Sequence, residues 1–281
     1  MNTTLQFDED ASRRLEAVYM TPDVVAQRRR VRDALKLSAG EDVLDVGSGP
    51  GLLAAEMAAA VGPSGSVRGV DVSDSMLAIA SARTPPEDAA PMEFVAASAE
   101  SLPFRDGSFD VAVSTQVYEY VEDVPRAVAE LHRVLRQGGR VAILDTDWDS
   151  IVCHSRDRER TERVLAAWEE HLVDARLPRR LRGMLDAGGF GFVRCEAVPM
   201  FNFGYQRNTF SAGIVAMIAE FVSGRGGIGA EEAAAWRADV VELGEDYFFS
   251  LNRYLFTAVR AQAPGASGTV GAPIAWNPPS T

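Results

Sequence analysis

The sequence predicts an α/β fold built on a mainly parallel sheet, and three observations support this. Short runs of apolar, β-prone residues alternate with stretches of helical character along the chain. The first such run, residues 43–46, enters a glycine-rich turn that leads directly into a helix-like run, Leu52 to Val61. The second run, Gly65 to Asp71, ends in an acid at the same point of its strand. A strand, a tight turn and a helix repeated in this way are typical of parallel sheets.

The turn after the first strand has the chemistry of a ligand-binding loop. Residues 41–51 read E-D-V-L-D-V-G-S-G-P-G, with glycines at alternate positions. Glycine permits positive φ and lets a ligand approach bare backbone, and the helix that follows presents free N–H groups. A dinucleotide fingerprint needs a further glycine where Leu52 stands. Asp45, two residues before the turn, suits a ligand with a cationic amine better than a pyrophosphate.

The acid that ends the second strand, Asp71, lies about 20 residues beyond the turn, where a carboxylate can hold both hydroxyls of a ribose. Such a carboxylate–diol pair is charge-assisted and geometrically selective. Both acids therefore predict a ligand that contains a ribose and an ammonium group.

Four stretches, found in order within residues 41–145, resemble one family. They read V-L-D-V-G-S-G-P-G, G-V-D-V-S-D-S-M-L, A-S-A-E-S-L-P-F-R-D-G-S-F-D-V-A-V-S and L-H-R-V-L-R-Q-G-G-R-V-A-I-L-D. In these stretches the chain resembles the class I S-adenosylmethionine (SAM)-dependent methyltransferases. The resemblance implies a Rossmann-like fold with seven strands, the last one antiparallel, and implies SAM as cofactor with S-adenosylhomocysteine (SAH) as product.

The elements follow in order. Helices are expected at 8–19 and 22–37, with Thr21 as N-cap and Pro22 at the first helical position. Ser73 should cap the helix that contains Met76. The remaining strands are expected at 92–97, 109–114, 140–144, 190–198 and 247–259, and the remaining helices at 124–135, 156–173, 177–187, 210–223 and 230–243.

Four parts of the chain are expected: a helical N-terminal lid over residues 1–38, the SAM-binding core over 39–150, an inserted helical cap with the last strands over 151–261, and a flexible tail over 262–281. The tail is rich in Pro, Gly, Ser and Ala and has no periodicity. The basic cluster Arg28 to Arg30 is expected to form a solvated face, and the functional alternative is that Tyr19 and Arg28 lie on a lid over the cofactor.

The resemblance assigns cofactor roles residue by residue. Met76 should touch the adenine face, and the Ala99 N–H should reach the adenine ring. Ser98 stands where related enzymes often carry Asp, which leaves the contact to the adenine amino group uncharged. The expected cofactor-binding residues are Tyr19, Arg28, Asp45, Gly47, Ser48, Gly49, Gly51, Asp71, Val72, Met76, Ser98, Ala99, Glu100, Thr115 and Gln116.

Methyl transfer from a sulfonium needs alignment of the reactants more than acid–base chemistry, so no obligatory catalytic motif is expected. If a proton must be removed, the candidate bases are His154, His171, Glu170 and Glu119. His154 follows the fifth strand, and His171 shares a helix face with Trp168. Each histidine also has a purely structural interpretation.

The composition of the chain limits the kinds of partner that the protein can be expected to bind. The 281 residues carry a net charge of −12, which argues against nucleic-acid binding through a basic surface. The cysteines, Cys153 and Cys195, lack metal-ligand spacing, so no metal is expected. No run of about 18 apolar residues suggests a membrane span, and the N-terminus lacks signal-peptide features. These features favour a cytoplasmic enzyme, and they are compatible with a homo-oligomer.

The segment beyond residue 150 resembles small-molecule methyltransferases of actinobacterial type, above all in T-D-W-D-S-I-V and Y-F-F-S-L-N-R-Y-L-F. Its apolar and aromatic content suits a small, largely apolar acceptor, as in a natural-product pathway, and equally suits an ordinary core between helices and sheet. Two alternatives stay open. One is a C-methyltransferase for a prenyl or quinone-like acceptor, with Glu170, Trp168 and Phe221 stabilising a cationic intermediate. The other is a SAM-binding regulator or cyclase that transfers no methyl group. A nicotinamide dehydrogenase is a third reading, weakened by Leu52.

Overall fold

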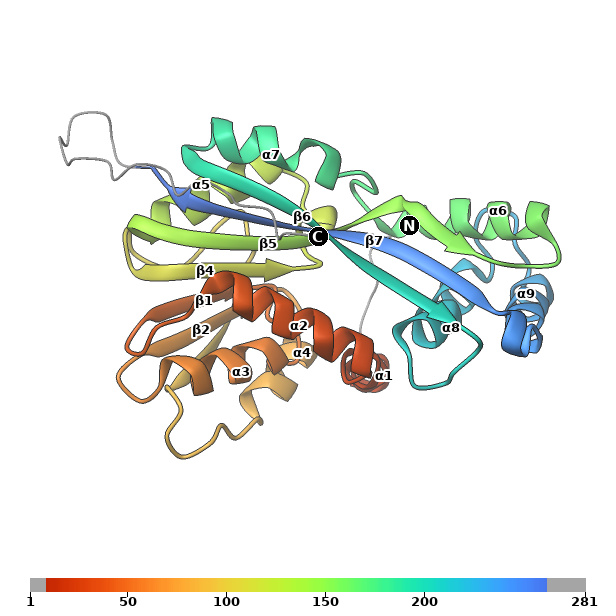
Figure 1. Cartoon of the computed structure of the whole chain (residues 1–281), viewed down its shortest axis with the longest axis horizontal. Helices are drawn as coiled ribbons and strands as arrows, with labels where there is room; N and C mark the ends of the chain where they lie inside the picture. The colour runs from red at the N-terminus through yellow and green to blue at the C-terminus, as the bar shows by residue number, and fades with distance from the viewer. Residues whose placement is uncertain (1–8, 262–281) are drawn as a thin grey trace, which may run out of the picture.

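A computed structural model describes residues 9–261, and the predicted tail lies outside them. Its centre is one seven-stranded sheet with the order β3-β2-β1-β4-β5-β7-β6 (Figure 1). The strands are β1 (Asp42–Val46), β2 (Ser66–Asp71), β3 (Met92–Ala96), β4 (Phe109–Thr115), β5 (Leu135–Cys153), β6 (Phe190–Phe203) and β7 (Phe248–Arg260). Neighbours from β3 to β5 run parallel, and β7 runs antiparallel to both β5 and β6. The predicted fold is therefore confirmed.

Nine helices within the described residues cover this sheet. They are α1 (Glu9–Tyr19), α2 (Pro22–Leu35), α3 (Leu52–Val61), α4 (Asp74–Ser81), α5 (Val124–Val134), α6 (Arg158–Trp168), α7 (Pro178–Ala187), α8 (Phe210–Val222) and α9 (Ala230–Glu242). As predicted, the Ser73 hydroxyl caps α4 by accepting a hydrogen bond from Met76 N. Helices α1 to α4 lie on one side of the sheet and α5 and α7 on the other (Figure 1).

The fifth strand is much longer than predicted. The expectation was a strand over 140–144 followed by an irregular segment, but β5 runs to Cys153 and pairs with β7 as far as Phe249. The sixth strand, predicted over 190–198, also continues through Phe203. The three long strands extend together because each satisfies the backbone hydrogen-bonding groups of its neighbour. Local sequence does not reveal pairing between strands so far apart in the chain.

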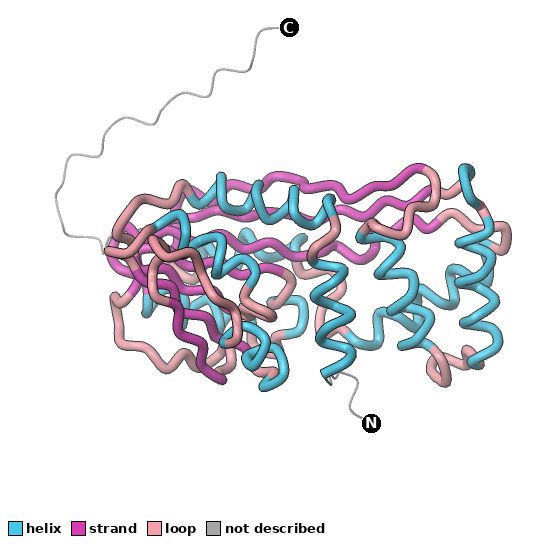
Figure 2. Tube along the Cα trace, turned by 90° about the horizontal axis from the view of Figure 1, so that it is seen from below, coloured by secondary structure: helices cyan, strands magenta, loops and turns pink. Residues whose placement is uncertain are grey.

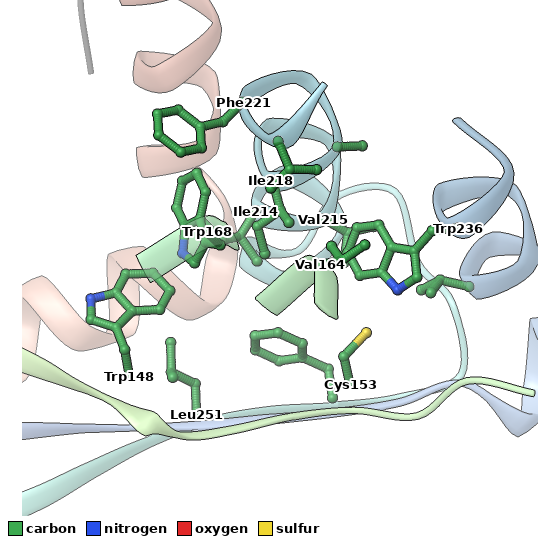
Figure 3. Packing of buried hydrophobic residues seen from close by; sticks show 14 of the residues in the cluster. Trp148, Cys153, Val164, Trp168, Ile214, Val215, Ile218, Phe221, Trp236 and Leu251 are labelled. Atoms are coloured by element: carbon green, nitrogen blue, oxygen red, sulfur yellow. The ribbon is translucent and has the colours of Figure 1, made fainter. Parts of the chain in front are cut away.

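The extension of β5, β6 and β7 carries the distal helices α6, α8 and α9 on one face (Figures 1 and 2). A buried cluster joins them to the strands, with Trp148 of β5, Trp168 of α6 and Phe249 of β7 among its members. Figure 3 shows Trp148 and Trp168 next to each other, with the Phe221 ring beyond Trp168. Trp168 lies 5.7 Å from Trp148 and 5.4 Å from Phe221 between ring centroids.

The helix predicted over 156–173 is shorter in the structure. It ends at Trp168, and a single 3₁₀ turn, η2 (Glu169–His171), follows. The backbone N–H groups of Val173 and Asp174 then donate to the carbonyl oxygen of Glu119, at 3.0 and 3.1 Å. Glu119 itself lies in η1 (Tyr118–Tyr120), just beyond β4. A backbone clamp therefore turns the chain away from a continued helix and fixes η2 against the end of β4.

The N-terminal helices bridge the two parts of the molecule. Helix α2 packs on β5 and β7, and α1 contacts α4 and α8. Asp23 Oδ2 accepts a 2.8 Å hydrogen bond from Phe210 N, so the start of α2 satisfies a free N–H at the start of α8. A Cβ on Gly213 would lie 2.5 Å from a Val18 methyl carbon, so α8 approaches α1 closely. The region between these helices and the sheet holds the candidate site.

Candidate functional site

A pocket of about 930 Å³ opens at the carboxyl ends of β1, β2 and β4, beside the point where the strand order reverses. This edge is where ligands bind in open α/β sheets. Helices α1, α2 and α8 and the side chain of Arg253 on β7 complete the wall. The volume is at the upper end of the roughly 300–1,000 Å³ typical of small-molecule sites, which leaves room for two small ligands.

The glycine turn adopts the conformation that its sequence predicts. Gly47, Gly49 and Gly51 have φ values of 72°, 51° and 74°. A Cβ on Gly47 would lie 2.1 Å from a Val117 methyl carbon, so this glycine is required by packing. A Cβ on Gly49 would meet nothing within 4 Å, so this backbone borders open space. Gly49 lines the pocket, and its turn can therefore accept a ligand against bare backbone.

Asp71 connects the second strand to this turn. Its Oδ2 accepts a 2.8 Å hydrogen bond from Gly49 N, and its Oδ1 accepts one of 2.9 Å from Ser73 N. Burial raises the pKa of Asp71, while these backbone N–H groups oppose the rise. A carboxylate has about four acceptor sites, so lone pairs remain for a diol in the pocket that Asp71 lines.

Asp45 lies directly beneath the turn and is 1% exposed. Its Oδ2 has no hydrogen-bond partner among residues 9–261. Burial, aided by the charge of Asp71, raises the pKa of Asp45 to about 7. Asp45 does not itself line the pocket, because Gly47 and Ser48 form the wall there. A buried carboxylate without a partner beside a ligand-binding turn is suited to a cationic group brought by the ligand.

The other predicted cofactor residues divide into two groups. Gly51 packs against Ala80 and Phe94 and is not part of the pocket wall. The remainder line the pocket: Tyr19, Arg28, Gly47, Ser48, Val72, Met76, Ser98, Ala99, Glu100, Thr115 and Gln116. Their individual contacts to a cofactor stay predictions.

Several of these side chains are already engaged within the protein, Arg28 and Ser98 among them. Arg28 Nε donates to Glu56 Oε1 at 3.0 Å, and Arg28 Nη1 donates to the Tyr19 carbonyl, which ties the end of α1 to α2. Ser98 Oγ accepts from Glu100 N at 3.1 Å. Ser98 therefore stabilises its own loop. Arg28 holds α1 and α2 together, so it fixes the shape of the lid in addition to contributing a positive charge.

Two candidate bases lie outside the pocket wall. His154 was expected to reach the crevice from the end of the fifth strand, but β5 runs nine residues past Leu144, and His154 is exposed, its N–H bonded to the Phe248 carbonyl at 3.0 Å. Glu170 is also exposed, at the side of Gly226. The extension of β5 thus carries His154 away from the ends of the central strands, whereas Glu170 lies on the exposed side of η2.

His171 lies behind the wall of the pocket. It is 3% exposed, and its ring centroid is 3.8 Å from that of Trp168 and 5.4 to 5.8 Å from those of Trp148, Tyr120 and Phe221. Nδ1 bonds to the Trp168 carbonyl, and Nε2 has no partner among the described residues. Burial lowers the pKa of His171 to about 4, so the ring is neutral near pH 7. His171 therefore packs behind the aromatic residues of the pocket wall and supports them.

Glu119 is the one of the four candidates that lines the pocket. It is fully buried, and its Oε2 accepts a 3.1 Å hydrogen bond from Thr146 N. Oε1 accepts no hydrogen bond of ordinary geometry in the part of the chain described, although Trp148 and Tyr120 lie close enough for their donors to lower the pKa of the carboxyl group. Burial raises the pKa of Glu119 to about 7, partly opposed by the Thr146 N–H and the charge of Arg253. A carboxylate poised near neutrality can accept a proton.

Comparisons with known proteins agree with this geometry. Residues 44–143 match the family described as "Methyltransferase domain". This stretch contains most of β1, the glycine turn, Asp71 and all of β4. The chain carries a class I SAM-dependent methyltransferase domain.

Relatives show how far the likeness to this methyltransferase domain extends. An uncharacterized 37.1 kDa protein in transposon TN4556 of Streptomyces fradiae is 36% identical over 207 residues, covering 66% of this chain and 57% of that protein. The 2-phytyl-1,4-naphtoquinone methyltransferase of Nostoc punctiforme is 41% identical over 116 residues. The match covers 40% of this chain and 50% of that protein. The chain thus spans about half the length of these curated relatives.

Solved structures of methyltransferases share the fold. A phosphoethanolamine N-methyltransferase 2 from Haemonchus contortus, solved with phosphomonomethylethanolamine and SAH, superimposes with a TM-score of 0.61. It is 19% identical, and the match covers 92% of this chain and 58% of that one. At this identity the likeness concerns the fold.

SAM is the cofactor of this methyltransferase domain, and the residues present fit it. Asp45 keeps an unpaired carboxylate buried behind the turn, where its charge attracts the cationic amino acid end across the wall formed by Gly47 and Ser48. The open backbone at Gly49 gives that end room, and Asp71 keeps free lone pairs for the ribose. Among residues 9–261 no cluster of three or more potential metal ligands occurs, and no helix has the length and hydropathy of a membrane span.

Among the pocket residues that sequence reasoning missed are Gln27, Trp148 and Arg253. A signal for Arg253 exists. In β7, Phe249, Leu251 and Leu255 are buried at odd-numbered positions, whereas the even-numbered residues 250, 252 and 254 are partly exposed. Arg253 has the phase of the buried set, and a charged residue at a core position of a strand indicates either a partner or a ligand.

Proposed function

We propose that this protein transfers a methyl group from SAM to a small, largely apolar, quinone-like acceptor. The observation that carries the proposal is the continuity of one pocket over two unlike surfaces. One surface contains the glycine turn and Asp71. The other is apolar and aromatic, with members from β5, α6 and α8: Trp148, Trp168, Phe210, Ile214 and Met217.

The relatives' names support the quinone-like character of the acceptor, since a naphthoquinone and a demethylmenaquinone methyltransferase match the core at 41% and 38% identity. A flat ring between aromatic walls fits the same chemistry. The variant of this hypothesis in which Glu170 stabilises a cationic intermediate loses its acid, because Glu170 is exposed outside the pocket wall. Neither the matched domain nor the naphthoquinone relative favours a regulator, a cyclase or a dehydrogenase.

SAM, when bound, supplies an activated methyl group. The protein's own part is to align the acceptor and to remove the proton that leaves the acceptor carbon or oxygen. We assign this proton to the Glu119 carboxylate, because the residue lines the pocket, its Oε1 accepts no ordinary hydrogen bond from the described residues and burial raises its pKa to about 7. Thr146 N holds the other oxygen in place.

The test is turnover with a defined acceptor. The protein is incubated with SAM and 2-phytyl-1,4-naphthoquinone that has been reduced to its quinol, and SAH and the product are followed by mass spectrometry. The expected result is equal amounts of SAH and of a product heavier by one methylene. SAH binding without any methylated product from this or shorter-chain quinols would reject the quinone-like acceptor.

A further inference from the structure

Arg253 is a buried cation that lacks an acid. Its side chain comes from β7 and is 3% exposed, yet no carboxylate within residues 9–261 forms an ion pair with it. Its Nη1 donates to Gln27 Oε1, its Nε has no partner, and its Cζ lies 4.3 Å from the centroid of the Phe210 ring. One neutral amide and one aromatic face are the neighbours that hold it.

This arrangement leaves a charge uncompensated. Taking a guanidinium out of water is unfavourable unless an anion and hydrogen-bond acceptors replace the water. The guanidinium has five N–H donors, and the Gln27 oxygen satisfies one of them. Glu119 and Asp23 act on Arg253 only through longer-range attraction. The remaining donor capacity borders the pocket that Arg253 lines.

The surroundings define what could complete this site. Arg253 borders the aromatic part of the pocket, where Trp148, Trp168 and Phe210 form walls. A charged Glu119 carboxylate repels an anionic group of the ligand. It can face an uncharged group of the ligand or accept a proton from one. A ligand with a flat apolar body and one anionic oxygen would therefore be oriented, its oxygen toward Arg253 and another atom toward Glu119.

We propose that Arg253 binds an anionic oxygen of the acceptor, a carboxylate or an ionised enol on an apolar ring, and so selects acidic acceptors over neutral ones of the same shape. This inference rests on the proposed function, because it assigns the aromatic part of the pocket to the acceptor. Gln27 and Phe210 are then positioning residues, since they hold the guanidinium by a hydrogen bond and by its aromatic face.

The experiment is calorimetric and needs no turnover. The protein is saturated with SAH and titrated with 2-naphthoate and with 2-naphthamide, which share a ring but differ in charge. A second pair, 2-hydroxy-1,4-naphthoquinone and its methyl ether, tests an ionised enol in place of a carboxylate. In the wild type we expect at least one anion to bind about tenfold to a hundredfold more tightly than its neutral partner, the range of a charge-assisted hydrogen bond.

Variants assign the preference to the residue. Arg253→Met should bring the ratio close to one, and Arg253→Lys should keep part of it, with SAH affinity within about twofold of the wild type in both. Arg260→Met, on the same strand but not part of the pocket wall, is the matched control and should keep the wild-type ratio.

Three outcomes would overturn the inference. Equal affinity for both members of each pair in the wild type removes the anion preference, and this result does not depend on how any variant folds. Loss of SAH binding in a folded Arg253→Met variant assigns Arg253 to the cofactor carboxylate instead. If the preference for anions survives in Arg253→Met, another residue is responsible for it. Failure of the wild type to bind SAH would instead reject the proposed function itself.

Discussion

Asp71 Oδ2 accepts a 2.8 Å hydrogen bond from the backbone N–H of Gly49, which lies 22 residues earlier in the chain. The carboxylate that is expected to hold the ribose therefore also shapes the turn that is expected to receive the amino acid end. Through this bond, the two halves of the cofactor site depend on each other.

Asp71→Ala should lower SAH affinity about tenfold to a hundredfold, the effect of losing a charged hydrogen bond of about 1.5–3 kcal/mol. Asp71→Asn keeps an acceptor for one N–H and should lose less. Calorimetry gives both affinities, and circular dichroism checks the fold. Wild-type affinity in a folded alanine variant would exclude the ribose role.

Glu119→Gln should reduce turnover at least a hundredfold, the contribution typical of a general base. In the wild type, kcat/KM should rise with pH up to about 7, because burial raises the pKa of Glu119 to about 7 and the base must be deprotonated. The rise should vanish in the glutamine variant, while SAH affinity stays near that of the wild type. A residual rate with the same pH profile would remove Glu119 from proton transfer.

Much of this site was predictable from local sequence. The glycine turn, the helix over Leu52–Val61 and the end of β2 at Asp71 appear as predicted, because a strand, its turn and its helix are encoded within some thirty consecutive residues. The extension of β5 was not, since it depends on pairing with β7, about a hundred residues later. His154 was misplaced for the same reason.

Arg253 illustrates a different limit. Its strand was predicted, but its role depends on Gln27 of α2 and Phe210 of α8, which no local pattern joins to it. Only its phase among buried strand residues gave a hint. Glu119 was a candidate among four, and the pocket wall separated it from the others.

Asp45 should make cofactor binding depend on pH. Burial raises the pKa of free Asp45 to about 7, and a bound ammonium group favours its charged form. Binding below pH 7 therefore releases a proton, and SAM affinity should fall as pH drops from 7 to 5.5. Calorimetry in two buffers of different ionisation enthalpy measures the released protons. Asp45→Asn should bind SAM more weakly, and its affinity should depend much less on pH. The dependence that remains is the smaller contribution of Asp71, whose pKa is also raised.

His171 should reduce stability in acid. Burial lowers its pKa to about 4, below the ordinary 6.5, so the unfolded chain binds more protons between these values. The free energy of unfolding should therefore fall as pH drops from 6.5 to 4, by on the order of 3 kcal/mol from this residue. Urea unfolding of His171→Phe should show a flatter profile over that range. Parallel profiles for variant and wild type would show that His171 does not carry the effect.

Gly47 and Gly49 should separate stability from binding. Both have positive φ, so alanine at either position adds strain of about 1–3 kcal/mol. At Gly47 the new Cβ would also lie 2.1 Å from Val117, so Gly47→Ala should lower the melting temperature more than Gly49→Ala does. At Gly49 the Cβ meets no protein atom within 4 Å but enters the pocket, so SAH affinity should fall more than tenfold.

Gly107 provides the matched control for the last substitution. It has a φ of 63° and open space at its Cβ position, as Gly49 does, but lies before β4 and outside the pocket wall. Gly107→Ala should thus show a similar loss of melting temperature with unchanged SAH affinity. If Gly49→Ala and Gly107→Ala lose the same small amount of stability and both bind SAH normally, the bare backbone at Gly49 is not in contact with the cofactor, and the turn acts only through its shape.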